Sequence, residues 1–145
     1  MTPGARVSAA IEILNAMADG LPAEQAMTRW ARSSRFAGSK DRAAVRDYVF
    51  DVLRQRRTAA HFGGGETGRA LMIGLLRAQG VDLGVLFTGE GHAPQPLSEP
   101  EQTAADAPTG SATLWNLPDW VIPDFTESLG DRAEAVALAL QSRAP

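Results

Sequence analysis

The sequence contains no cysteine among its 145 residues, which excludes disulfide bonds, thiolate nucleophiles and cysteine-ligated metal sites. Neither of its two histidines, His61 and His92, has an acidic residue or another histidine four positions away, so the pattern predicts no metal site. No apolar run approaches the roughly 18 residues that cross a membrane, and Glu12 interrupts the one stretch that could form a signal-peptide core. These absences favour a cytoplasmic protein that does not enter a membrane.

Positive charge is scarce in the chain as a whole but concentrated in one stretch. The formal net charge is −3, yet nine of the fourteen basic residues lie between positions 29 and 57. They are Arg29, Arg32, Arg35, Lys40, Arg42, Arg46, Arg54, Arg56 and Arg57. Only Asp41, Asp47 and Asp51 oppose them there, so the stretch favours a polyanionic partner. Because the planar guanidinium group fits phosphate, we predict that these side chains bind phosphate groups.

Apolar residues recur at helical spacing and no segment alternates like a strand, so the pattern predicts an all-α fold. A first helix capped by Thr2 is expected to end at Gly20, and Pro22 opens a second. The third and longest helix is predicted over residues 40–57, with Ser39 as its cap. Its inward stripe is Val45, Tyr48, Val49, Val52 and Leu53.

A glycine-rich motif follows the third helix. The run Gly63–Gly68 has the G-x-G-x-x-G spacing of nucleotide-binding loops, but such a loop follows a strand and this one follows a basic helix. We therefore interpret it as a turn between helices, with Thr67 as the cap of the next one. The three tryptophans and Tyr48 could stack on nucleobases. Their spacing favours core packing, and among them Trp115 is expected to be partly exposed.

Composition divides the chain into three parts: a helical domain over residues 1–87, a segment rich in proline, glycine and acid over 88–113, and a helical segment over 114–145. The middle part is either a linker or an irregular segment wrapped on the core. Ser98–Glu101 matches a capping box, which could start a short helix there. In the last part, Asp131 is predicted to cap the final helix.

Two runs of the sequence resemble a known family. The run SKDRAAVRDYVFDVLRQRR over residues 39–57, preceded by AMTRW over 26–30, resembles the NusB-type helical domain. The run LPDWVIPDF over 117–125 and the run LGDRAEAVALALQSRAP over 129–145 resemble the entry to the catalytic part of certain methyltransferases. Together, the runs are similar to the N-terminal domain of bacterial ribosomal-RNA cytosine-C5 methyltransferases of the RsmB/Sun (Fmu) group. Only the segment from residue 88 to 113 has no place in the resemblance.

The resemblance implies a NusB-like helical bundle that helps to seat ribosomal RNA for an attached catalytic domain. The RNA-facing residues of the family would lie, by position, among Arg29, Arg32, Arg35, Lys40, Arg42 and Arg46. Asp47 and Asp51 oppose the middle of the third helix, so we expect the strongest positive field in this group and a separate cluster at Arg54–Arg57.

The family's catalytic domain binds S-adenosylmethionine and attacks the base with cysteine thiolates. The present sequence has no cysteine and no strand followed by a glycine-rich turn and a helix, which S-adenosylmethionine would need. We therefore expect the chain to bind no cofactor and to be catalytically inert by itself. The resemblance implies that it is a fragment of a longer protein and that its partner in the same polypeptide is the methyltransferase domain.

Two other interpretations stay open. The chain could be a NusB-like protein-interaction module that acts in transcription antitermination and recruits a ribosomal protein. It could also be a domain that only packs against a catalytic part, with the basic stretch as a solvated helix face. A coding sequence that continues into a cysteine-bearing domain would exclude the first. Salt-sensitive RNA binding that depends on Arg32, Arg35 and Arg46 would exclude the second.

Overall fold

The computed structural model describes residues 1–103 and 111–142, and in these ranges the chain is built from helices without any strand. The predicted all-α class is confirmed. No helix in the two ranges is both long enough and apolar enough to cross a membrane. The elements are α1 (Pro3–Ala18), α2 (Ala23–Ser33), α3 (Ser39–Arg54), α4 (Arg56–Gly63), α5 (Gly68–Ala78), η1 (Leu83–Val85), η2 (Pro100–Gln102), α6 (Ser111–Trp115), η3 (Asp119–Val121), α7 (Ile122–Leu129), η4 (Gly130–Arg132) and α8 (Ala133–Leu140).

Helices α1 to α5 form a bundle, and threonine side chains cap the starts of α1 and α5. Thr2 Oγ1 accepts a hydrogen bond from the Ala5 N–H at 3.1 Å, and Thr67 Oγ1 accepts one from the Ala70 N–H at 3.1 Å. Each bond satisfies an N–H group that a helix start leaves without an intrahelical acceptor, so both predicted threonine caps are confirmed. The inward faces of α1, α3 and α5 supply the core. Its largest fully buried side chains are Ile13, Met72, Ile73, Leu75, Leu76, Val7, Val45, Val49 and Val52.

The third helix is shorter than predicted. It ends at Arg54, because Gln55 leaves the helical region with φ −124° and ψ 31°, and α4 begins at the next residue. The prediction that the helix continues to Arg57 is therefore wrong. The break lets α4 change direction and pack along α5, where glycines at positions 63 and 74 allow a close approach. Tertiary packing thus overrides the helical preference of the local sequence.

Two predicted caps are also wrong. Ser39 is the first residue of α3, and Gly38 precedes the helix and donates its N–H to the Asp41 carboxylate at 3.2 Å. Asp41, the third residue of the helix, thus accepts from the residue before it, which is the half of a capping box that the N3 side chain supplies. Asp131 lies inside the η4 turn, and this turn delays the start of α8 to Ala133.

Helices α4 and α5 cross with their backbones in contact. A Cβ atom at Gly63 would lie 1.8 Å from the Ala70 carbonyl oxygen, and one at Gly74 would lie 1.6 Å from the Ala59 carbonyl oxygen. Only glycine fits at these two positions. Gly64 adopts φ 74° and turns the chain between the helices. The G-x-G-x-x-G motif is therefore a turn between helices, as predicted.

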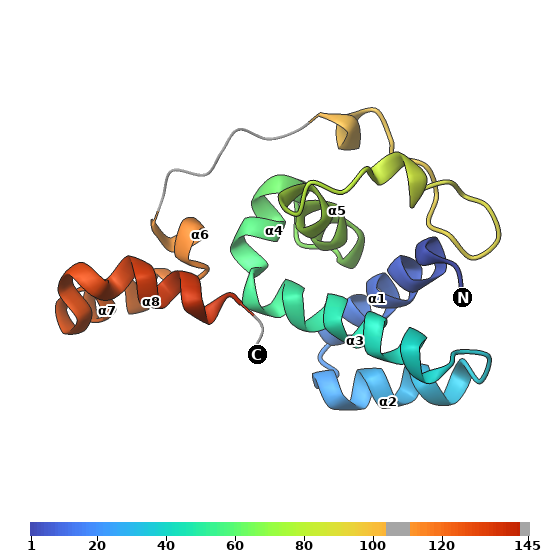
Figure 1. Ribbon diagram of the computed structural model, residues 1–145, viewed down its shortest axis with the longest axis horizontal. Coiled ribbons are helices and arrows are strands. Elements are labelled where there is room, and N and C mark those ends of the chain that lie inside the picture. The colour runs from blue at the N-terminus through green and yellow to red at the C-terminus, as the bar shows by residue number, and fades with distance from the viewer. Residues whose placement is uncertain (104–110, 143–145) are drawn as a thin grey trace.

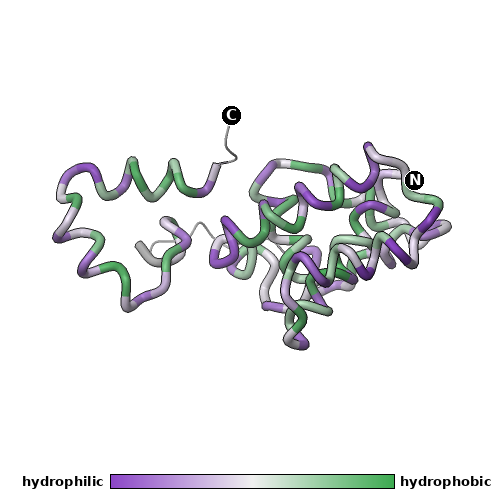
Figure 2. Tube along the Cα trace, turned by 90° about the horizontal axis from the view of Figure 1, so that it is seen from below, coloured by the Kyte–Doolittle hydropathy of each residue, from purple (hydrophilic) through white to green (hydrophobic). Residues whose placement is uncertain are grey.

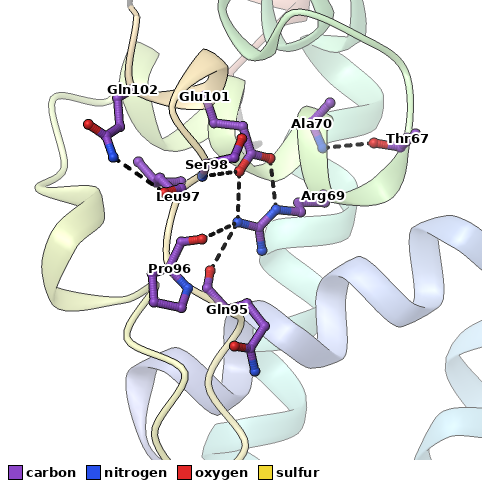
Figure 3. Close-up of polar contacts among 9 residues, drawn as sticks. All are labelled: Thr67, Arg69, Ala70, Gln95, Pro96, Leu97, Ser98, Glu101 and Gln102. Atoms are coloured by element: carbon purple, nitrogen blue, oxygen red, sulfur yellow. Dashed lines mark hydrogen bonds and ion pairs between the residues drawn. The ribbon is translucent and has the colours of Figure 1, made fainter.

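Residues 88–103 wrap over the bundle and are held by Arg69 of α5 (Figure 3). The Arg69 guanidinium donates to the Glu101 carboxylate at 2.8 and 2.9 Å and to two backbone carbonyls of the wrapped segment at 2.9 and 3.1 Å. Glu101 also accepts from the Ser98 N–H at 2.8 Å, as in a capping box. Residues 88–103 therefore lie against the bundle as an irregular segment, and residues 104–110 lie outside the described ranges.

Helices α6, α7 and α8 stand to one side of the bundle (Figures 1 and 2). We call residues 111–142 the C-terminal segment. The segment reaches the bundle through α6, which contacts α4. Several of its large apolar side chains remain exposed, and Trp120 is the extreme case at 79%. The others are Leu114, Leu138 and Leu140.

Candidate nucleic-acid interface

Six of the nine basic residues that the sequence singled out lie on α2, on α3 or in the loop between these two helices. This loop, residues 34–38, is called the joint below. All six side chains are exposed. They define the α2–α3 basic group: Arg29 and Arg32 on α2, Arg35 in the joint, and Lys40, Arg42 and Arg46 on α3.

The α2–α3 basic group surrounds α2 instead of covering a single face. Arg42 and Arg46 line a groove of about 380 Å³ between α2 and α3, with Trp30 in its wall. Arg29 and Arg32 line a second hollow on the outer side of α2. This spread is possible because α2 lies at the edge of the bundle and buries only two of its side chains, those of Ala26 and Trp30.

Five members of the group have no ion-pair partner within the described ranges, and Arg46 is the exception. Its guanidinium lies 3.4 Å from the Glu24 carboxylate and 5.4 Å from the centre of the Phe50 ring. Both side chains of the ion pair are largely exposed, at 58% and 71%. Such surface pairs contribute about 0–1 kcal/mol, so Arg46 can exchange Glu24 for another anion.

Asp41, which lies between Lys40 and Arg42 in the sequence, is engaged by other positive groups. The Asp41 carboxylate accepts a hydrogen bond from Arg6 Nε at 2.9 Å and lies 3.5 Å from the N-terminal amino group of Met1. The Arg6 bond, with a further bond from the Gly38 N–H, holds the pKa of Asp41 below its usual value. Its negative charge is therefore matched by Arg6 and the N-terminus, and it does not cancel Lys40 or Arg42.

The other three predicted site residues, Arg54, Arg56 and Arg57, form the α3–α4 basic group, and each has an acidic partner. Arg54 lies 2.6 Å from Asp51, which is buried, and Arg57 lies 2.9 Å from Asp119. Arg56 lies 4.0 Å from a glutamate at position 66. The structure therefore separates the predicted site into an exposed group in which only Arg46 has an acidic partner and a group in which Arg54 and Arg57 are used within the fold. Arg56 is intermediate, because its pair is as exposed as that of Arg46.

Within the α3–α4 basic group, Arg57 belongs to a contact that attaches the C-terminal segment. Besides its ion pair, Arg57 donates to the Leu117 carbonyl at 3.0 Å. Next to it, the Thr58 N–H donates to Asn116 Oδ1 at 2.9 Å, and Asn116 Nδ2 donates back to Thr58 Oγ1 at 2.8 Å. Asn116 therefore acts as the N-cap that α4 lacks in its own sequence, and it adopts φ 56° to do so.

The aromatic residues divide into core and surface members. Trp30 is buried and Tyr48 is half-buried, as their helical spacing predicted. Trp115 is half-buried against Phe125, which agrees with its predicted partial exposure, but Trp120 is far more exposed, at 79%. One exposed aromatic was missed: Phe36, in the joint, is 66% exposed. The sequence feature that could have identified it is an aromatic residue in a run of serine, glycine and arginine, with no apolar residue at helical spacing from it.

The described ranges hold no group of three or more histidine or acidic residues that could bind a metal ion. The chain matches no family model, no curated protein and no solved structure with which it was compared. The family resemblance therefore rests on the quoted runs of sequence. What the residues themselves establish is a basic surface around the joint that has few acidic partners.

Proposed function

We propose that the chain is the RNA-binding N-terminal domain of an S-adenosylmethionine-dependent ribosomal-RNA 5-methylcytosine methyltransferase and that it helps to seat the RNA. One observation carries this proposal: five exposed basic residues around the joint have no ion-pair partner in the described ranges. A guanidinium without a fixed carboxylate is available to phosphate, and several such groups together attract a polyanion. The family resemblance supplies the identity of the RNA and of the attached enzyme.

The placement of charge on α3 supports a binding role. Lys40 and Arg42 lie in the first turn of α3, where the helix dipole disfavours positive charge by about 0.3–1 kcal/mol for each exposed residue. Asp41 in the same turn offsets part of this cost. The positive end of the α3 dipole and these side chains add to the same field. An arrangement that opposes helix stability but concentrates positive potential suits the binding of an anion.

In this proposal, methyl transfer and cofactor binding belong to a separate catalytic domain of the same polypeptide. The exposed apolar side chains of the C-terminal segment, among them Trp120 and Leu138, supply the surface on which that domain packs. The coding sequence beyond Pro145 tests this part. A continuation into strands and a cysteine-bearing domain is expected, and it would exclude the antitermination alternative. A stop without such a domain would contradict the methyltransferase assignment.

The RNA-binding part is tested by the dependence of affinity on salt. If five phosphates are bound, the slope of log affinity against log salt is about −3.5 to −4.5, and the affinity for a ribosomal-RNA hairpin falls about 100- to 500-fold between 50 and 200 mM salt. Fluorescence anisotropy with a labelled hairpin measures both values. A flat salt profile would leave the chain with a packing role only.

Charge reversals locate the interface. The double variant Arg32→Glu/Arg35→Glu is expected to remove most of the affinity and to flatten the salt profile, because two attractive charges become repulsive. The single variants Arg32→Glu and Arg35→Glu each have Arg132→Glu as a control of equal charge change, since Arg132 is also exposed but lies in the C-terminal segment. A loss from Arg132→Glu equal to that from either single variant would show that only the net charge matters and that the joint is not the interface.

A further inference from the structure

The joint is built to hold one aromatic ring in solvent. Ser34 and Ala37 at its two sides are buried, at 9% and 5% exposure, and the Ala37 N–H donates to the Ser34 carbonyl at 3.0 Å. Between them, Arg35 and Phe36 point outward, and Phe36 is 66% exposed. The anchors on either side fix the turn, so the exposure of Phe36 is a property of the fold.

A second turn brings another ring to the same place. In the wrapped segment, the Gly89 N–H donates to the Pro94 carbonyl at 2.9 Å, and the Ala93 N–H donates to the Glu90 carbonyl at 3.0 Å. Pro94 is buried, and Ala93 packs closely against α1. A Cβ atom added to Gly4 of α1 would lie only 2.7 Å from the Ala93 Cβ atom. His92 is therefore exposed on a turn that is fixed to the bundle.

The two rings face each other across the molecular surface. The ring centres of Phe36 and His92 are 6.1 Å apart and their planes differ by 16°. Burying a phenylalanine would stabilise the fold by about 1.5–3 kcal/mol, so the exposed ring does little for the stability of the chain. Arg35 precedes it directly and Lys40 follows at the start of α3. Exposed rings beside unpaired basic side chains are the arrangement that binds unpaired nucleotides.

We propose that Phe36, with His92 beside it, is a stacking platform for an unpaired nucleobase of the bound RNA. The inference rests on the proposed RNA-binding function and refines it. A base stacked on Phe36 places its flanking phosphates near Arg35 and Lys40, which anchor the backbone while the ring holds the base. The joint then selects single-stranded or looped RNA over a regular duplex, because a paired base presents only its edges.

The test compares one mixed-sequence RNA oligonucleotide as a single strand with the same strand annealed to its complement. Phe36→Ala is expected to weaken single-strand binding about five- to 150-fold, the effect of losing one stacked base. Binding to the duplex should change less than about twofold, and the salt slope should stay the same because no phosphate contact is removed. Phe36→Tyr should retain affinity and Phe36→Leu should lose it, since only tyrosine keeps a ring. His92→Ala should cause a smaller loss.

Val85→Ala is the control, because Val85 is also 66% exposed and lies in η1, outside the joint. Unchanged thermal unfolding of the Phe36 variants shows that the fold is intact. If Phe36→Ala binds the single strand as the parent does while Arg32→Glu/Arg35→Glu does not bind, the platform is wrong and the RNA-binding proposal stands. Equal losses on strand and duplex, or equal affinities of Phe36→Leu and Phe36→Tyr, would also overturn stacking. A parent chain without salt-sensitive RNA binding would overturn both proposals.

Discussion

The two basic groups of this chain have similar composition but differ in how many of their members are paired with carboxylates. The α2–α3 basic group is exposed, and within the described ranges only Arg46 has an acidic partner. In the α3–α4 basic group, Arg54, Arg56 and Arg57 each lie within 4.0 Å of a carboxylate. The number of arginines in a stretch therefore does not define a binding surface. The positions of the carboxylates decide which arginines are available to a ligand and which hold the fold together.

The largest predicted effect separates the roles of the two groups. Arg54→Met is expected to lower the free energy of unfolding by about 2–3 kcal/mol, because the buried Asp51 carboxylate loses an ion-pair partner at 2.6 Å. The value lies below that for fully buried pairs, since the Arg54 side chain is 28% exposed. Arg32→Met should change stability by less than about 0.5 kcal/mol. Urea unfolding of both variants measures the difference.

The same pair of variants should behave in the opposite order towards RNA. Arg32→Met is expected to weaken binding and to reduce the salt slope by about 0.7–0.9, which corresponds to one phosphate contact. Arg54→Met should leave both values unchanged under conditions where it is folded. Two variants with equal stability and equal affinity would mean that the two groups do not differ in role.

The next effect extends the comparison to Arg69, another basic residue used within the fold. Its hydrogen bond to Glu101 is the main cause that lowers the pKa of this carboxyl from 4.5 to about 2. A lowered pKa in the folded state stabilises the protein above about pH 4.5, and this contribution is lost as pH falls towards 2. With both side chains about a quarter exposed, we expect the contribution to be about 1–2 kcal/mol.

Unfolding measured from pH 6 to pH 2 tests this contribution. Glu101→Gln should be less stable than the parent at pH 6, and the two should converge near pH 2, where the parent carboxyl becomes protonated. Asp41 and other carboxylates add their own pH dependence, which both proteins share, so only the difference between them is informative. Parallel curves at all pH values would show that the Arg69–Glu101 pair does not stabilise the wrapped segment.

The smallest effect concerns the one ion pair of the α2–α3 basic group. Glu24→Gln should change the free energy of unfolding by less than about 0.5 kcal/mol, because the pair with Arg46 is exposed. It should raise RNA affinity about twofold at low salt by removing a competing negative charge. Glu66→Gln, which removes the partner of Arg56, is the matched control and should not change affinity. An equal gain in affinity from Glu24→Gln and Glu66→Gln would show that the effect comes from net charge alone.

The sequence predicts most of the local structure and the division of the basic residues. The caps formed by Thr2 and Thr67 could be predicted, because a threonine cap needs only the N–H groups of residues that follow it closely in the sequence. Asp51 lies three residues before Arg54 on the same helix, and this spacing indicates that the two side chains form an ion pair. The break at Gln55 could not be predicted, because no glycine or proline marks it. It follows from the packing of α4 on α5, which joins residues that are distant in sequence.

The remaining parts of the site depend on distant contacts. Asp119, the partner of Arg57, lies 62 residues further along the chain, so its role could not be derived from local pattern. The same holds for Phe36 and His92, which come together only because the wrapped segment crosses the bundle near the joint. Asn116 is a third case, since it caps a helix that begins far upstream.

The backbone contact between α4 and α5 also has a consequence for the recognition of relatives. Gly63 and Gly74 cannot accept even a methyl group, because each would place it within 2 Å of a carbonyl oxygen. Surface arginines and loop residues can diverge without loss of the fold, whereas these two glycines cannot change while the helices cross as they do. A diverged sequence that keeps the glycine pair at this spacing, between amphipathic helices, can therefore be identified as a candidate homologue when overall similarity is too weak to find it.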